Sequence, residues 1–226
     1  MKSKLLITTS CFLLTAFFGC ATAPKYIDKN WYKKEEKTVR KDIIESAYKI
    51  KKMEPSYNDR IKIYDQLKKE KVPYIMDCSG FVRAVYVMTG INQLENNIKK
   101  ISGERNVQRI WKILYQHNKI YSKNIKPVKG DIIFFDNTYD TDRNPETYDK
   151  LTHIGIVENV DSKGTIKYIH SSVDEGVIVS FANRRYPRKD TLLRKRRKKD
   201  PKGTKYHSGE LINSFGTFFN IPKKKM

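Results

Sequence analysis

The sequence contains little cysteine: three among 226 residues, at positions 11, 20 and 78. Two of them lie in the first twenty residues, so the rest of the chain has a single thiol, Cys78. One thiol cannot build an intramolecular disulfide framework, which excludes the class of small exported domains held together by disulfides. No group of Cys and His has the spacing of a zinc site either. We therefore expect no metal and no cofactor.

Long apolar runs are also missing, since none reaches the ~20 residues that cross a bilayer. Residues 5–18 are mostly apolar and follow two lysines, which fits the apolar region of a secretory signal peptide. Ala21-Thr22-Ala23 is one possible cleavage site, but Pro24 would follow the cut, and its fixed ring geometry suits a scissile bond poorly.

The alternative cleavage site precedes Cys20. Phe17-Phe18-Gly19-Cys20 resembles the bacterial lipoprotein signal, in which the cysteine is lipidated and becomes the new N-terminus. We favour this reading. It predicts a signal peptide over residues 1–19, a lipid-anchored tether over 20–37 and a domain over 38–226. It also predicts that the protein lies in a bacterial cell envelope, at the periplasmic side and on the outer membrane.

Acidic residues are few relative to basic ones, 25 against 46, which gives a net charge of +21. Such a charge favours anionic partners. The stretch from Arg184 to Lys205 holds twelve Lys or Arg and only two acidic residues. No recognition motif accompanies it, so no nucleic acid is expected. The stretch is either a solvated loop or a contact with anionic lipid or wall polymer.

Periodicity places helices in the first half of the chain. Apolar spacing of three or four residues predicts helices over residues 39–53 and 107–115, and a weaker one through Ile61, Tyr64 and Leu67. The clearest helix follows Asp77, a good N-cap, and ends before Gly90, which suits the C′ position.

Buried strands follow in the second half, around residues 131–135, 153–157, 165–170 and 176–181, with short turns between the last three. Short turns indicate antiparallel neighbours. Helices followed by strands predict an α+β fold, with N-terminal helices packed on a mostly antiparallel sheet. Residues 211–221 are apolar again and are expected to pack back on the domain.

Cys78 directly follows the predicted N-cap Asp77. Its sulfur would lie where backbone N–H groups are unpaired and the helix dipole is positive, and both features lower a thiol pKa. The same N–H groups could stabilise an oxyanion. The alternative is a buried cysteine that only packs.

Two of the four histidines lie at matching strand ends. His153 begins one strand and His170 ends its neighbour, so antiparallel pairing could bring the two imidazoles together. His153 would then be the general base and His170 the group that orients it. His117 and His207 are expected at the surface.

Four motifs in order resemble the NlpC/P60 family of papain-like cell-wall cysteine peptidases: Asp-Cys-Ser-Gly-Phe-Val at 77–82, Gly-Asp-Ile-Ile-Phe-Phe at 130–135, His-Ile-Gly-Ile-Val at 153–157 and Tyr-Ile-His-Ser-Ser at 168–172. The resemblance covers about residues 55–182. It implies a papain-like fold with Cys78 as nucleophile, His153 as base and His170 as third polar residue.

The resemblance also implies the substrate. Family members cut peptidoglycan stem peptides, often between D-glutamate and the diamino acid, and many are lipoproteins. Substrate contacts would come from Asp77 and Ser79, and from Tyr74 in place of the tyrosine and paired glycines that many members carry. Two alternatives stay open: an N-acetylmuramoyl-L-alanine amidase with the same residues, and a non-catalytic lipoprotein that binds the envelope.

The long segment before His153 carries Asp140, Asp142 and Asn144, which imitate the start of a calcium loop. Pro145 replaces the glycine that such a loop requires, and Leu151 stands where a bidentate Glu belongs. We therefore interpret this segment as a polar loop beside the active site.

Overall fold

A computed structural model describes residues 36–144 and 148–223. The expected signal peptide, the tether and the lipidation site Cys20 lie outside these residues. No helix in the described part of the chain combines the length and the hydropathy needed to cross a membrane.

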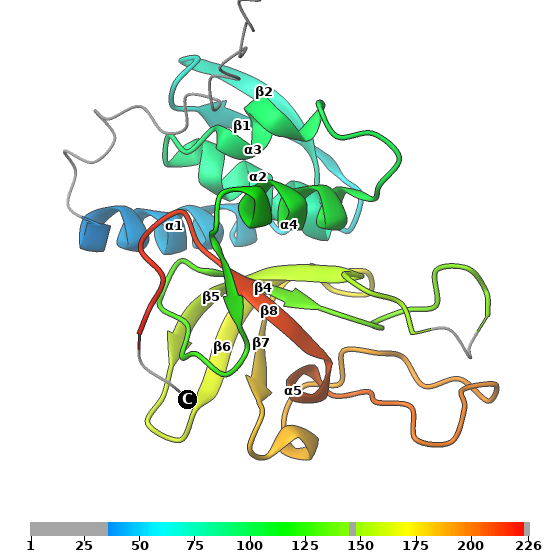
Figure 1. Cartoon of the computed structure of the whole chain (residues 1–226). Helices are drawn as coiled ribbons and strands as arrows, with labels where there is room; N and C mark the ends of the chain where they lie inside the picture. The colour runs from blue at the N-terminus through cyan, green and yellow to red at the C-terminus, as the bar shows by residue number, and fades with distance from the viewer. Residues whose placement is uncertain (1–35, 145–147, 224–226) are drawn as a thin grey trace, which may run out of the picture.

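The molecule has a helical layer over one antiparallel sheet (Figure 1). The larger helices are α1 (Glu36–Lys51), α2 (Cys78–Met88), α3 (Gln93–Ile98) and α4 (Asn106–Gln116). The sheet has the order β3-β8-β4-β5-β6-β7, and all its pairings are antiparallel. These strands are β3 (Ile120–Ser122), β4 (Ile132–Phe135), β5 (His153–Val160), β6 (Thr165–Ser172), β7 (Gly176–Asn183) and β8 (Ile212–Gly216). The predicted α+β class is confirmed.

A predicted helix is wrong. The residues around Ile61 form an antiparallel hairpin of β1 (Arg60–Asp65) and β2 (Glu70–Ile75). Ile63 is buried while its neighbours are more exposed, a period of two that suits a strand. Asp65 accepts the N–H groups of Leu67 and Lys68 at 2.9 and 3.0 Å and so closes the turn.

The core lies on both faces of the sheet. Helix α2 packs against β5 and β6, and its apolar side chains, including Phe81, Val82 and Val85, are fully buried. A second apolar cluster on the opposite face contains Phe135, Tyr168 and other aromatic residues. Burial on both faces explains why the sequences of these strands are nearly continuous apolar runs.

Helix α1 is tied to the sheet by a buried ion pair. Arg40 Nη1 donates to Asp131 Oδ1 at 2.8 Å and to the carbonyl of Lys129 at 2.7 Å. The Tyr121 hydroxyl also donates to Asp131, and the guanidinium stacks 4.0 Å from the Phe219 ring centroid. Asp131 of the Gly-Asp motif therefore holds the fold together instead of lining the predicted site.

The C-terminal apolar segment packs on the domain as predicted, but its form was not foreseen. It forms β8, preceded by the short helix α5 (Ser208–Leu211), and inserts between β3 and β4. Ile133 pairs with Phe215, so residues 82 positions apart are neighbours in the sheet.

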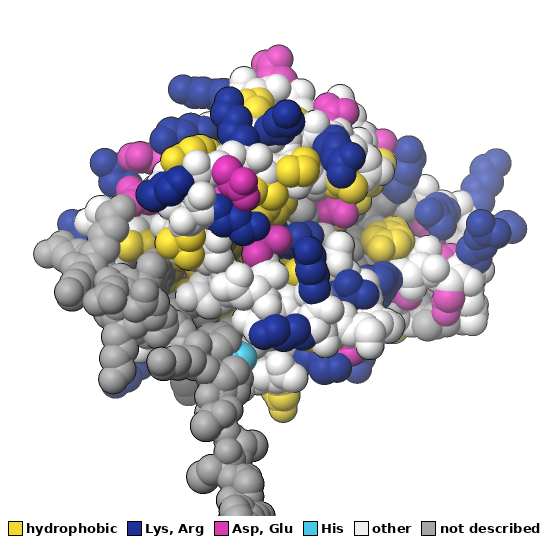
Figure 2. Space-filling view, turned by 90° about the horizontal axis from the view of Figure 1, so that it is seen from above, with side chains coloured by type: hydrophobic (Ala, Val, Ile, Leu, Met, Phe, Trp, Pro, Cys, Tyr) yellow, Lys and Arg dark blue, Asp and Glu magenta, His cyan; other side chains and the backbone are white. Residues whose placement is uncertain are grey.

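The basic stretch is only partly a solvated loop. It includes the 3-10 turn η2 (Pro187–Lys189), and it lies on the same side of the sheet as the loop after β4 (Figure 1). Arg194 within it is 4% exposed. Seen from above, Lys and Arg are spread over the helical face among acidic and apolar side chains, so the charge of the molecule is not confined to the stretch (Figure 2).

His207, expected at the surface, is mostly buried. Its side chain is 16% exposed and Nδ1 lies 3.1 Å from the carbonyl oxygen of Asp190. The local pairing of Leu192 with His207 draws this histidine against the domain.

Candidate active site

Cys78 begins α2 at the floor of a cleft of about 850 Å³. Asp77 is the N-cap and accepts the N–H of Gly80 at 2.6 Å and the hydroxyl of Ser79 at 2.7 Å. Asp77 and Ser79, both predicted to contact substrate, line the cleft, but Asp77 Oδ1 and the Ser79 hydroxyl are used within the helix cap. The cap fixes the direction in which the Cys78 sulfur faces the cleft.

Gly80 is required because the start of α2 passes close to the end of β2. A Cβ at this position would lie 1.8 Å from the carbonyl oxygen of Ile75. Only glycine lets the helix approach the strand so closely. The glycine of the Asp-Cys-Ser-Gly motif therefore sets the depth of the thiol.

The two predicted histidines meet. His153 Nε2 lies 2.8 Å from His170 Nδ1, and the two rings are nearly perpendicular. Both residues line the cleft together with Cys78. Since Nε2 of His153 is engaged, its Nδ1 is the nitrogen left for a reacting group. The thiol lies at the backbone N–H of Ile154, the residue that follows His153.

A further polar side chain, Ser180, contacts His170 on the side away from His153. His170 Nε2 lies 2.9 Å from the hydroxyl of Ser180 on β7. His170 is 2% exposed, and its two contacts fix the orientation of the ring. Nothing in the local pattern of β7 distinguishes Ser180 from an ordinary strand residue, and it was not predicted.

Burial controls the ionisation of the site. It raises the pKa of the Cys78 thiol to about 12, with the charge of Asp77 adding to the rise and nearby backbone N–H groups opposing it. Burial also lowers the pKa of His153 to about 4. Burial and the neighbouring His153 lower the pKa of His170 well below its ordinary value. The resting site therefore holds a neutral thiol and neutral imidazoles, in place of the ionised thiolate expected from the helix N-terminus.

The structure does not bring Tyr74 to the cleft. Its ring is 4% exposed and lies under the guanidinium of Arg83, 5.6 Å from the ring centroid. Tyr57 lines the cleft in its place, with its hydroxyl at the backbone N–H of Cys78. Burial and the charges of Cys78 and Asp77 raise the pKa of Tyr57, so it stays a hydrogen-bond donor. Tyr57 lies in an irregular segment between α1 and β1, where no sequence pattern marked it.

The loop between β4 and β5 gathers acidic residues, although not in the calcium-loop pattern. Single carboxylate oxygens of Asp140, Asp142 and Asp149 lie within 4.8 Å of one another. The third member of this group is Asp149, and not Asn144 as the calcium-loop spacing would predict. Asp149 accepts hydrogen bonds from the backbone N–H and the hydroxyl of Thr141.

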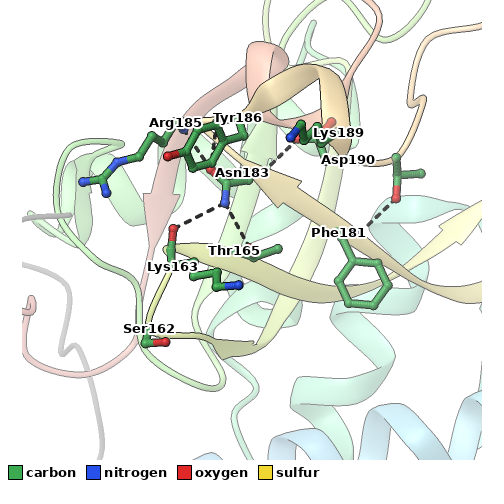
Figure 3. Close-up of a pocket in the computed structure, with 10 residues that line it drawn as sticks. Ser162, Lys163, Thr165, Phe181, Asn183, Arg185, Tyr186, Lys189 and Asp190 are labelled. Atoms are coloured by element: carbon green, nitrogen blue, oxygen red, sulfur yellow. Dashed lines mark hydrogen bonds between the residues drawn. The ribbon is translucent and has the colours of Figure 1, made fainter.

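A second hollow lies on the other side of β7, around Phe181, Tyr186 and Asn183 (Figure 3). The Asn183 amide is held by the carbonyl of Lys163 and the hydroxyl of Thr165. Its lining contains neither cysteine nor histidine, so it offers no nucleophile and base.

The α+β fold, with a cleft lined by Cys78, His153 and His170, is that of a papain-like domain. The family model of the CHAP domain matches residues 68–172. Residues 68–172 are thus similar to the CHAP domain, a cysteine- and histidine-dependent amidohydrolase or peptidase family related to NlpC/P60. This family supports a peptidoglycan hydrolase of the amidase or peptidase type. Comparison with curated proteins and with solved structures finds no match.

Proposed function

We propose that the protein is a cysteine endopeptidase that cuts an amide bond in peptidoglycan stem peptides, of the type between D-glutamate and the diamino acid. The observation that carries the proposal is the cleft in which Cys78, at a helix N-terminus, shares a lining with the hydrogen-bonded pair His153 and His170. Nucleophile, base and orienting group are the parts that acyl transfer through a thioester requires.

The neutral resting site defines the first step. Cys78 gives its proton to His153 as the sulfur attacks the carbonyl carbon of the scissile amide. His170 Nδ1 accepts the N–H at Nε2 of His153 and keeps the His153 ring in place as the charge develops. Because His153 holds the proton only during the reaction, it can return that proton to the leaving amine.

The oxyanion of the tetrahedral intermediate needs donors close to the sulfur. The backbone N–H of Cys78 and the hydroxyl of Tyr57 lie together at this point. Expulsion of the amine leaves a thioester between Cys78 and the acyl half of the peptide. A water molecule, deprotonated by His153, then hydrolyses the thioester and restores the thiol.

The test is a digest of purified peptidoglycan by residues 21–226, wild type against Cys78→Ala, with the released fragments identified by mass. We expect fragments cut within the stem peptide from the wild type alone. A cut at the muramyl–peptide junction would replace the endopeptidase by the amidase. The absence of fragments from a wild type that binds peptidoglycan would favour a non-catalytic binding protein.

Substitutions of the three proposed catalytic residues are expected to lower the activity by different amounts. Cys78→Ala abolishes hydrolysis with the fold intact, and His153→Ala lowers kcat nearly as far. His170→Ala retains part of the activity, because an orienting group costs less than the nucleophile. The rates are measured on the same digest, with circular dichroism as the control for folding. Equal activity in all three variants would refute the assignment.

We also propose that the domain acts from a lipid anchor in the cell envelope, at the outer membrane. The proposal rests on the signal-like residues 1–19 and on Cys20, which follows them. Cell fractionation of the full chain checks it. Cys20→Ala should move the protein from the membrane to the soluble fraction, and a wild type found only in the soluble fraction would contradict the anchor.

A further inference from the structure

Part of the basic stretch forms a wall of the catalytic cleft. Residues 191–197 line the same cleft as Cys78 and His153, although they lie beyond the matched residues 68–172. The stretch was expected either as a solvated loop or as a contact with lipid or polymer. Its position beside the thiol suggests a third role, in which it contacts the substrate.

This wall is held in place by several contacts. Arg194 Nη1 donates to the carbonyl and to the side-chain oxygen of Asn137 at 2.9 and 2.8 Å, and Nη2 donates to Asp200 at 3.1 Å. The backbone N–H groups of Leu193 and Arg194 both donate to the carbonyl of Tyr206. The wall is therefore a fixed surface, and ordering it costs little when a ligand binds.

The wall presents two cations that have acidic partners and two that have none among the described residues. Arg194 is neutralised by Asp200, and Arg197 lies 3.9 Å from Asp140. Lys195 and Arg196 have no carboxylate within ion-pair distance among the described residues, and both are exposed to the cleft. The guanidinium of Arg196 rests 4.7 Å from the ring centroid of Tyr206, which orients it while its N–H groups stay available.

A further cation faces the same cleft from the helical side. Arg105, at the start of α4, donates from Nη2 to the carbonyl of Lys150 at 2.9 Å. Its Nη1 is buried without a hydrogen-bond partner. A buried donor of this kind is costly unless a ligand satisfies it. Guanidinium groups match the two oxygens of a carboxylate, so a ligand of this class suits Arg105.

We infer that Arg105, Lys195 and Arg196 form a carboxylate-binding subsite, which makes the cleft select peptides with a free carboxyl group beside the scissile amide. The inference rests on the proposed function, since it assumes that the cleft receives a peptide. It adds the feature of the peptide that is recognised, and it gives the basic stretch a role in specificity.

The test uses two synthetic stem peptides that are identical except that the α-carboxyl group of the γ-linked glutamate is free in one and amidated in the other. We expect wild-type kcat/KM to be at least about tenfold higher for the free acid, mainly through KM. Lys195→Gln with Arg196→Gln should close most of this gap by slowing cleavage of the acid.

A matched control changes the same number of charges in the same segment. Lys198→Gln with Lys199→Gln alters two exposed residues that do not line the cleft, and it should keep the wild-type preference. Measurable cleavage of both peptides by the wild type at equal kcat/KM would overturn the inference. So would an equal loss of preference in the control, because the effect would then come from net charge.

A binding measurement separates this inference from the proposed function. Calorimetric titration of Cys78→Ala with each peptide reports recognition without hydrolysis. Tighter binding of the acid by Cys78→Ala supports the subsite even where the wild type cuts neither peptide, an outcome that would refute the endopeptidase alone. Equal affinity for both peptides would refute the subsite while leaving the endopeptidase intact.

Discussion

At the scale of single residues, the ionisation of the thiol is the feature with the clearest consequence. Cys78 has the helix N-terminus that lowers thiol pKa values elsewhere, yet burial and Asp77 outweigh it. Under the proposed mechanism, the nucleophile forms by proton transfer to His153 when substrate is present.

This state predicts the pH dependence of alkylation. With a thiol pKa near 12, the thiolate fraction rises about tenfold per pH unit across the neutral range, and iodoacetamide should label Cys78 at rates that rise in the same way. Residues 21–226 contain no other cysteine, so Cys78→Ala gives the blank. A rate that stays flat from about pH 5 to 8 would instead indicate a thiolate–imidazolium pair.

At the scale of elements, the close approach of α2 to the end of β2 depends on Gly80, which has no side chain. Gly80→Ala would place a methyl group 1.8 Å from the Ile75 carbonyl, so the helix must shift. We expect about 1–3 kcal/mol of lost stability, the usual cost of overpacking, and a loss of activity larger than the stability loss explains. Thermal unfolding and the peptidoglycan digest measure the two effects.

The control for Gly80 is a glycine with space around it. At Gly164, in the turn between β5 and β6, a Cβ would meet nothing within 4 Å, and asparagine tolerates its positive φ. Gly164→Asn should therefore keep both stability and activity. If Gly80→Ala behaved in the same way, the close approach of helix and strand would not matter for the thiol.

The attachment of α1 to the sheet rests on one buried ion pair. Arg40 and Asp131 have side chains that are 6% and 0% exposed, so Arg40→Met leaves a buried carboxylate without its cation. We expect a loss of about 3–5 kcal/mol in the free energy of unfolding, measured with urea. Adding Asp131→Asn to the Arg40→Met variant should restore part of the lost stability.

The neighbouring residue provides the comparison. Lys41 forms an exposed ion pair with Glu45, and such pairs contribute little. Lys41→Met should change stability by less than about 1 kcal/mol. An equal loss in Lys41→Met and Arg40→Met would mean that α1, and not the buried pair, is sensitive to charge.

Elements differ in how far the sequence predicts them. The capped helix α2 and the strands β4 to β7 depend on local patterns and short turns, and they were predicted. The hairpin of β1 and β2 was mistaken for a helix because Ile61, Tyr64 and Leu67 also fit a helical spacing. Strand β8 was missed because its partners, β3 and β4, are far away in the chain.

The residues of the candidate site fall into the same two groups, those that local patterns predict and those that they do not. Cys78, His153 and His170 stand in motifs, and strand pairing was enough to bring the histidines together. Tyr57 and Ser180 depend on how distant segments pack, and no local pattern marks them. Similarly, the charge of residues 191–197 is visible in the sequence, but its place in the cleft depends on Arg194 reaching the loop after β4.

At the scale of the whole molecule, the buried histidines couple stability to pH. In the unfolded chain His153 titrates near its ordinary value of 6.5, and in the fold its pKa is about 4. Between these values the unfolded state binds more protons, so stability falls as pH is lowered from about 6.5 to 4. Asp190 acts in the opposite direction, because burial raises its pKa to about 6.

A variant isolates the histidine contribution. Urea unfolding of the wild type and of His153→Gln over this pH range should give curves whose difference grows as pH falls, with the wild type losing more stability. Subtracting the two removes the effect of Asp190, which both proteins share. A constant difference would show that His153 is not the group that titrates.

The position of β8 between β3 and β4 also determines the order in which the sheet can be completed. Until β8 is in place, β4 has an unpaired edge and β3 lacks the strand with which it pairs. Unpaired edges attract other strands, and the closing contact spans about 80 residues, which slows its formation. A chain whose final strand is not yet in place therefore exposes strand edges that can pair with other chains, and this incomplete stage ends when β8 is inserted.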